Sequence, residues 1–406
     1  MRKLFKNSLT HPYMDEEVYA EIGRENRKLQ EILQENKLNE YIRKLKIIIG
    51  FREHEKYVEE MKCFGRKVLF CTYKMKNSFR DIYLNLLKKH GFQVTLYENI
   101  SPNPTLSQML KGVELIEPPD FILALGGGSV IDTAKAISVG IYGDLWDFVE
   151  GKAEIKKTIP LVAISTTSGT GSHLTPYAVI TNETTLEKKT LKNLLILPKL
   201  SIVDLEITAS MPKSVIASTG FDVLCHSIEV FTRKDCTKLA AGLSIESIKL
   251  IKSNLLASYE GKSIQNKLGM IFADIYAGMA LALIGTHVPH AISHPISARF
   301  GTSHGQALAY IFPETIKKQL EKNSKELNNK FEFISKLLGG NDIIKTLRDY
   351  INALELDNKP AFSEEECENI VKDTLGYRRS SVERSPVPLS DEDIKEIVYK
   401  SLLYIK

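Results

Sequence analysis

The chain has 406 residues, of which 43% are hydrophobic and 26% charged, so it can bury a core large enough for about two domains. Its net charge is only +4 and its basic and acidic residues are interspersed, which argues against nucleic acid or a membrane as a partner and favours a small molecule. The five cysteines lack CxxC spacing, and no apolar run approaches membrane-spanning length, so we expect reduced cysteines and a cytoplasmic protein.

Residues 1–44 are polar and rich in helix-forming side chains. Apolar residues recur there every three or four positions, at Leu29, Ile32, Leu33, Tyr41 and Ile42. That period is typical of an amphipathic helix. We therefore predict a helical N-terminal extension over residues 1–44.

Residues 45–204 alternate between short β-rich runs and amphipathic helical stretches. The β-rich runs are KIIIGF, KVLFCTY, QVTLYE and DFILALGGGS, which begin at residues 46, 67, 93 and 120. Such alternation is the pattern of a parallel sheet with crossover helices. The sequence predicts an α/β domain with a Rossmann-like parallel sheet over residues 45–204.

After residue 204 the strand pattern fades and long helical patterns run to the C-terminus. Ser390, followed three residues later by Asp393, predicts the capped start of one of these helices. We predict an all-α domain over residues 205–406.

The first motif with chemical content is FILALGGGSVIDTAKAIS, at 121–138. An apolar strand ends in three glycines and Ser129, and a helix follows, so backbone N–H groups and the helix dipole face the end of the strand. That arrangement suits a pyrophosphate. A tight strand-to-helix turn needs glycine as well, so this motif alone leaves both interpretations open.

The second motif, PLVAISTTSGTGSHLT at 160–175, repeats this logic with threonine and serine hydroxyls after an apolar strand. Two such loops at neighbouring strand ends favour a phosphate-bearing ligand in the crevice that they share.

A third motif, STGFDVLCHSIE at 218–229, lies in a helix that we expect to open near Pro212. Asp222 and His226 are one turn apart and project from the same face. A solvated ion pair is the simpler alternative for such a spacing. The apolar neighbours indicate burial, however, and a metal ion would compensate a buried carboxylate.

The fourth motif, GTHVPHAISHPISARFGTSHG at 285–305, holds four of the nine histidines. Pro289 suits the first position of a helix, which places His290 and His294 one turn apart before Pro295 interrupts the helix. His304 returns from the next loop, and we interpret His287 as structural. One carboxylate and several imidazoles suit zinc or ferrous iron, but spacing alone does not select the ligands.

These motifs together resemble those of the iron-containing (group III) alcohol dehydrogenases, from about residue 45 to the C-terminus, and SPNPT at 101–105 fits as well. The resemblance implies a metal, Fe²⁺ or alternatively Zn²⁺, held by Asp222, His226, His290 and His304. It implies that His294 stays unligated and transfers a proton. The cofactor contacts that it implies are Gly127, Gly128, Ser129, Asp132, Thr167, Thr170 and Ser172.

The implied activity is an NAD(P)-linked alcohol dehydrogenase or aldehyde reductase, with hydride transfer between nicotinamide and a small primary alcohol or aldehyde bound to the metal. The resemblance also implies a homodimer. The chain departs from the family pattern at Tyr73, which precedes Lys74 where an aspartate is common, and this favours NADP over NAD. Further departures are His173, which replaces an acid near the expected cofactor edge, and His287.

Two other functions stay open at this point. A lyase or cyclase similar to dehydroquinate synthase would share the scaffold, but it needs a cluster of lysines and arginines beside the metal, which is not evident in the second half of the sequence. A non-catalytic binding protein that uses residues 1–44 is the other alternative, and the intact metal and glycine motifs argue against it.

Overall fold

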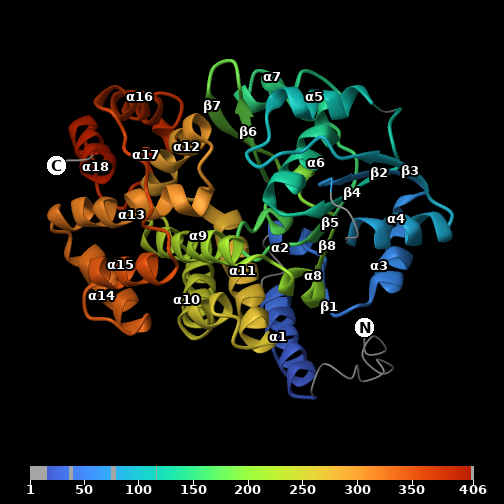
Figure 1. The fold of residues 1–406 in the computed structure, drawn as a ribbon, viewed down its shortest axis with the longest axis horizontal. Coiled ribbons are helices and arrows are strands. Elements are labelled where there is room, and N and C mark those ends of the chain that lie inside the picture. Colours follow the sequence, from blue (N-terminus) through green and yellow to red (C-terminus); the bar gives the residue numbers. More distant parts are fainter. Residues whose placement is uncertain (1–15, 36–39, 75–78, 116, 404–406) are drawn as a thin grey trace.

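The chain forms an α/β half beside a helical half (Figure 1). The computed structural model describes residues 16–35, 40–74, 79–115 and 117–403. Helices α9 (Lys213–Thr232) and α11 (Ile264–Ile284) lie where the two halves meet. The domain limits predicted above stay a prediction, taken up under the proposed function.

The α/β half is built on a six-stranded sheet in the order β1-β8-β5-β4-β2-β3, and every pairing is parallel. Its strands are β1 (Ile47–Gly50), β2 (Lys67–Thr72), β3 (Gln93–Tyr97), β4 (Phe121–Gly126), β5 (Leu161–Ser165) and β8 (Leu200–Asp204). Every residue of β4, β5 and β8 is buried, as expected for parallel strands covered on both faces. The predicted Rossmann-like sheet is confirmed.

Helices cover both faces of this sheet. Because successive side chains of a strand point to opposite faces, Phe70 and Leu123 pack with α3 (His54–Met61), α4 (Phe79–Lys89) and α8 (Leu205–Ala209). On the other face, Ile122 and Ala124 pack with α6 (Gly128–Gly140). Helices α5 (Leu106–Glu114) and α7 (Leu145–Glu150) lie next to α6. Short 3₁₀ helices are η1 (Lys62–Phe64), η2 (Ser172–Leu174) and η3 (Leu194–Ile196).

A separate antiparallel hairpin follows the second motif, and the sequence analysis did not predict it. It consists of β6 (Tyr177–Asn182) and β7 (Glu187–Lys192). Ala178 and Ile180 alternate with outward-facing residues and bury one side of the hairpin. Its position matters because β7 carries lysines to the cavity described below.

The helical half contains no strand within the described residues 205–403, which confirms the predicted all-α class. Besides α9 and α11, its helices are α10 (Lys238–Tyr259), α12 (Val288–Phe300), α13 (His304–Glu321), α14 (Lys325–Leu337), α15 (Ile343–Ala353), α16 (Glu364–Leu375), α17 (Arg379–Val382) and α18 (Asp391–Leu402). The predicted cap of α18 is present: Ser390 Oγ accepts from the Asp393 N–H at 3.1 Å.

Helix α12 corrects one prediction, because it continues through Pro295 to Phe300. A proline removes one helical hydrogen bond and strains the preceding turn. Here Ala291, Ile292 and Ile296 are completely buried around it, so packing of the helix outweighs that local cost.

A second correction concerns apolar runs. Helices α9 and α11 are both long and apolar enough to cross a membrane, which the sequence analysis did not expect. Most of each apolar stretch is buried inside the protein. They are therefore core helices, and their composition reflects burial on all sides.

The N-terminal segment forms α1 (Glu16–Glu35) and α2 (Glu40–Lys44), while residues 1–15 and 36–39 lie outside the described part. Ile22 and Leu29 are buried in a cluster shared with α11. The Tyr41 hydroxyl donates to the backbone carbonyl of Leu174 at 2.8 Å. The segment thus packs close behind the second motif.

Candidate metal centre and cofactor cleft

Four side chains from three helices converge at the predicted metal site. Asp222 Oδ1 lies 3.5 Å from His226 Nε2, 3.4 Å from His290 Nε2 and 3.8 Å from His304 Nε2. The rings of His226 and His290 stack with centroids 4.6 Å apart. The four residues that the resemblance implied as ligands are therefore adjacent in space.

Local packing explains how His304 reaches this place. His304 is the first residue of α13, and Gly305 follows it. A Cβ at Gly305 would lie 1.8 Å from the backbone oxygen of Ser218 in α9. Only glycine allows α13 to start against α9, and this contact brings His304 to Asp222.

The donor set fits a divalent metal ion. Asp222 Oδ1 and His290 Nε2 are buried, and neither has a hydrogen-bond partner in the described part of the chain. Unsatisfied buried polar atoms are costly, and one carboxylate with three imidazoles is a set that Fe²⁺ and Zn²⁺ accept. A metal ion at their common centre would satisfy these atoms.

The protonation of the cluster agrees with this interpretation. Burial lowers the pKa of His226 to about 4, so its imidazole is neutral at pH 7 and able to ligate. At His290, burial is opposed by the charges of Glu229 and Asp222, which raise the pKa to about 9. A metal ion would displace the proton held there.

Glu229 is a site residue that the sequence analysis missed. Its Oε1 is hydrogen-bonded to His290 Nδ1, and its Oε2 accepts from the His287 N–H at 2.6 Å. A carboxylate on the second ring nitrogen fixes the orientation of a ligating histidine and increases its basicity. The i, i+4, i+7 spacing of Asp222, His226 and Glu229 places all three on one face of α9 and was the available indication.

His294 and His287 have different surroundings. The His294 ring lies 5.3 Å from that of His304 and faces the cavity, and its Nδ1 has no hydrogen-bond partner among the described residues. Burial, together with the positive charges of Arg378 and Lys188, lowers the pKa of His294 well below its usual value. His287 Nε2 lies 3.2 Å from the Thr232 hydroxyl and outside the cavity lining, as expected for a structural histidine.

The two glycine-rich loops lie side by side. Strand β4 pairs with β5, so Gly126 is opposite Ser165 at the carboxyl end of the sheet. A Cβ at Gly127 would lie 3.0 Å from Thr167, and one at Gly128 would lie 3.0 Å from Thr170. A side chain at either glycine would therefore crowd the second loop, which adds to the role of glycine in the turn.

Of the implied cofactor contacts, Gly128, Ser129, Asp132, Thr170 and Ser172 line the cavity, whereas Gly127 and Thr167 pack against each other behind it. Asp132 faces the second motif: its carboxylate accepts from the Ser172 hydroxyl and, at 2.9 Å, from the Val179 N–H. The carboxylate thus positions the second loop against α6.

Lys135 and Asp274 also hold the second loop, and the sequence analysis missed both. The buried Lys135 Nζ donates to the carbonyl oxygens of Ser172 at 2.7 Å and of Thr175 at 2.9 Å. Asp274 Oδ1 accepts from the Gly171 N–H at 3.0 Å. Burial raises the pKa of Asp274 to about 7. His173 is buried behind this loop and does not line the cavity, contrary to its expected place at the cofactor edge.

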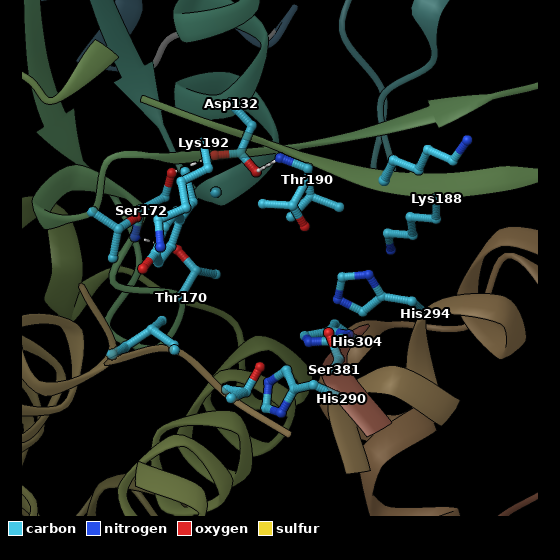
Figure 2. A pocket seen from close by; sticks show the side chains of 18 of the residues that line it. Asp132, Thr170, Ser172, Lys188, Thr190, Lys192, His290, His294, His304 and Ser381 are labelled. Carbon is cyan, nitrogen blue, oxygen red and sulfur yellow. Dashed lines mark hydrogen bonds between the residues drawn. The ribbon is translucent and has the colours of Figure 1, made fainter. Parts of the chain in front are cut away.

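A cavity of about 430 Å³ joins the loops to the metal cluster. Figure 2 shows Asp132, Thr170 and Ser172 on one wall and the three histidines His290, His294 and His304 on the other. This crevice lies at the carboxyl ends of the strands, near the point where the strand order reverses: β3 lies on one side of β2, and β4, β5 and β8 lie on the other. Dinucleotides bind at such switch points in open α/β sheets.

The fold and this site define a metal-dependent oxidoreductase that works with a nicotinamide dinucleotide. Two family models match the chain: "Iron-containing alcohol dehydrogenase" over residues 45–205, and "Fe-containing alcohol dehydrogenase family, C-terminal" over residues 216–402. The chain belongs to the iron-containing alcohol dehydrogenase family.

Relatives agree with this assignment. The NADPH-dependent butanol dehydrogenase of Clostridium saccharobutylicum is 34% identical over 292 residues, which cover 69% of this chain and 74% of that protein. Aldehyde-alcohol dehydrogenase 2 of Entamoeba histolytica is 32% identical over 66% of this chain, but the match spans only 33% of that longer protein.

Solved structures show the same fold. An alcohol dehydrogenase from a halo-thermophilic archaeon of a Red Sea brine pool superimposes with a TM-score of 0.84 and 35% identity, over 88% of this chain and 97% of the other. The chain is thus an NAD(P)-linked alcohol dehydrogenase by family, and these matches give no support to the lyase or cyclase alternative.

Proposed function

We propose that the protein interconverts a small primary alcohol and its aldehyde with NAD(P), using Fe²⁺, or alternatively Zn²⁺, held by Asp222, His226, His290 and His304. The observation that carries this proposal is the buried Asp222 Oδ1, which faces three imidazole nitrogens within 3.8 Å and has no hydrogen-bond partner among the described residues.

When bound, the metal supplies Lewis-acid polarisation of the substrate oxygen and the nicotinamide supplies or accepts the hydride. The chain's own residues would orient the metal ligands and transfer the proton. Glu229 orients His290, and the helices around the cluster exclude water from it. His294, on the cavity wall beside the cluster, would take the hydroxyl proton at a ring nitrogen during alcohol oxidation and return it in the reverse direction.

The cofactor would lie along the two loops, with its pyrophosphate at the N-terminus of α6. We propose contacts to Gly128, Ser129, Asp132, Thr170 and Ser172, which line the cavity, with Gly127 and Thr167 supporting the two loops. We also propose a preference for NADP, because Tyr73 and the exposed Lys74 follow β2 where a carboxylate would repel a 2′-phosphate.

We further propose three functional parts: the helical extension 1–44, the dinucleotide-binding domain 45–204 and the metal-binding domain 205–406. Two features support this division: the parallel sheet lies within residues 47–204, and every described metal-site residue lies after residue 205. A homodimer is proposed from the family resemblance, and a cytoplasmic location from the composition of the sequence.

An anaerobic assay tests the proposal. Purified protein reloaded with Fe²⁺ or Zn²⁺ is mixed with NADPH or NADH and with each of a series of short aldehydes. The decrease in the absorbance of the reduced cofactor is followed. We expect metal-dependent oxidation, faster with NADPH. Absence of turnover with any aldehyde in a folded, metal-loaded sample would overturn the proposed function.

A further inference from the structure

The cavity beside the metal cluster is lined by more positive than negative side chains. Five basic residues line it: Lys188, Lys189, Lys192, Arg378 and Arg384. The carboxylates that line it are Asp132 and Asp222. A basic cluster beside the metal was not evident in the sequence, and the structure corrects this, because Arg378 and Arg384 join the cavity wall only in the folded chain.

The three lysines have partners of different kinds, and the buried Lys188 has only a neutral hydrogen-bond acceptor. Lys189 Nζ lies 3.1 Å from both Glu150 and Glu187. Lys188 feels the negative charges of both cavity carboxylates and donates to Asn103 Oδ1 at 2.8 Å. Lys192 Nζ lies over the Tyr177 ring, 5.4 Å from its centroid. The other two basic residues that line the cavity are Arg378 and Arg384.

Arg378 is a buried cation without an anion. Its side chain is 9% exposed, and it donates only to neutral hydroxyls, Thr190 Oγ1 at 3.5 Å and Ser381 Oγ at 3.3 Å. Its Nε has no partner, and no carboxylate of the described residues pairs with it. A buried, unpaired guanidinium is unfavourable, and one that is nonetheless present is typical of a site that binds an anion.

Arg384 strengthens this positive potential. Burial, with a smaller contribution from the charge of Arg384, lowers the pKa of Arg378 to about 10, so Arg378 stays charged at neutral pH. No carboxylate of the described residues pairs with Arg384 either, whereas the neighbouring Arg233 forms a two-bond pair with Asp235 at 2.7 and 2.6 Å.

The position of Arg378 distinguishes a substrate group from a cofactor phosphate. Ser381, which accepts from Arg378, belongs to α17, and α17 packs against α12, the helix that carries His290 and His294. The charge of Arg378 also acts on His294. Its guanidinium therefore belongs to the wall where the substrate meets the metal, while the pyrophosphate site is on the opposite wall.

We propose that the substrate is an aldehyde or alcohol with an anionic group, such as a carboxylate, sulfonate or phosphate, and that Arg378, aided by Ser381 and Arg384, binds this group. The inference rests on the proposed function and specifies its substrate class. The guanidinium fork would form paired hydrogen bonds with two oxygens of the anion, which fixes the direction of the carbonyl relative to the metal.

The test compares two aldehydes of equal chain length, 4-oxobutanoate and butanal, in the metal-loaded enzyme with NADPH. We expect kcat/KM to be at least about 30-fold higher for 4-oxobutanoate, because loss of a buried charge pair costs at least that factor. In Arg378→Met this ratio should fall to near one, and Arg378→Lys should recover part of it. The matched control is Arg379→Met, whose side chain pairs with Asp391 outside the cavity, and it should keep the wild-type ratio.

Calorimetry provides a readout without turnover. Metal-loaded wild-type protein should bind 4-hydroxybutanoate more tightly than 1,4-butanediol. In the same experiment, 3-hydroxypropanesulfonate and 3-hydroxypropyl phosphate show which anion is preferred.

Equal kcat/KM for both aldehydes in the wild type, or a preference for butanal, would overturn the inference while leaving the proposed function intact. A weaker NADPH affinity in Arg378→Met with an unchanged aldehyde ratio would assign the arginine to the cofactor and overturn it as well. If no aldehyde of the series reacts, the proposed function fails, and equal binding of the acid and the diol would then also overturn the anion site.

Discussion

The metal cluster and the cofactor loops occupy opposite walls of one cavity and are built by different means. The cluster consists of ionisable side chains on long buried helices, each held by partners such as Glu229. The loops from Gly127 to Ser129 and from Thr166 to Ser172 offer backbone N–H groups and small hydroxyls, and their shape depends on close contacts between the loops. The metal wall therefore carries the ionisable groups of the reaction, whereas the loop wall has a shape complementary to a cofactor.

This difference predicts how each wall responds to substitution. Removing a charged ligand should abolish the chemistry and leave the fold in place. Adding a single methyl group to a loop should weaken cofactor binding and leave the metal in place. The following variants test that separation, beginning with the largest expected effect.

Asp222→Ala removes the carboxylate at the centre of the cluster. We expect kcat/KM to fall by about 1000-fold or more, since Lewis-acid stabilisation contributes several kcal/mol to the transition state. Metal content per chain, measured by mass spectrometry, should fall with it. Asp349→Ala, on the exposed face of α15, is the control and should match the wild type in both measurements. Full activity in Asp222→Ala would contradict the proposed ligand set.

Glu229→Gln keeps the shape of the side chain but removes the charge that orients His290. Metal affinity should fall by about 10- to 100-fold, as for other carboxylates that support a ligating histidine. Competition with a zinc chelator gives the dissociation constant. An unchanged constant would mean that Glu229 serves only packing.

Gly128→Ala tests the opposite wall. The added Cβ would lie 3.0 Å from the Thr170 side chain, which must therefore shift by a few tenths of an ångström. We expect the Kd of NADPH to rise by about 10-fold with metal content unchanged, because such overpacking costs about 1 kcal/mol or more. Gly242→Ala, where a Cβ meets nothing within 4 Å, should have no effect on cofactor binding.

Asp274→Asn tests the support behind the second loop. Burial raises the pKa of Asp274 to about 7, above its unfolded value, so the folded protein binds the additional proton and loses stability as the pH rises through 7. Between pH 6 and pH 8 this loss should be about 1 kcal/mol in the wild type and absent in the variant. Urea unfolding at the two pH values measures the free energy of unfolding. The same change with pH in the wild type and the variant would contradict the assigned protonation of Asp274.

The sequence predicted the parts of the fold whose residues are adjacent along the chain. The sheet was predictable because β4, β5 and β8 are continuous apolar runs followed by loops. The β6–β7 hairpin was missed because its alternation is short and interrupted by polar residues. The course of α12 through Pro295 was missed because the packing that stabilises it is tertiary.

The site shows the same limit. Spacing along single helices indicated Asp222 with His226, and His290 with His294, but the family resemblance was needed to choose among the histidines. Glu229 was within a quoted motif, yet nothing local shows that its carboxylate contacts His290. Arg378 reaches the metal wall from the far end of the sequence, so only the folded chain reveals its position.

The most direct test of the central claim is an anomalous difference map, recorded at the iron absorption edge, from crystals grown anaerobically with Fe²⁺. The account predicts one peak per chain, bonded to Asp222 and to Nε2 of His226, His290 and His304, with His294 beyond bonding distance. A peak bonded to His294 in place of His304, or a peak elsewhere in the protein, would contradict it.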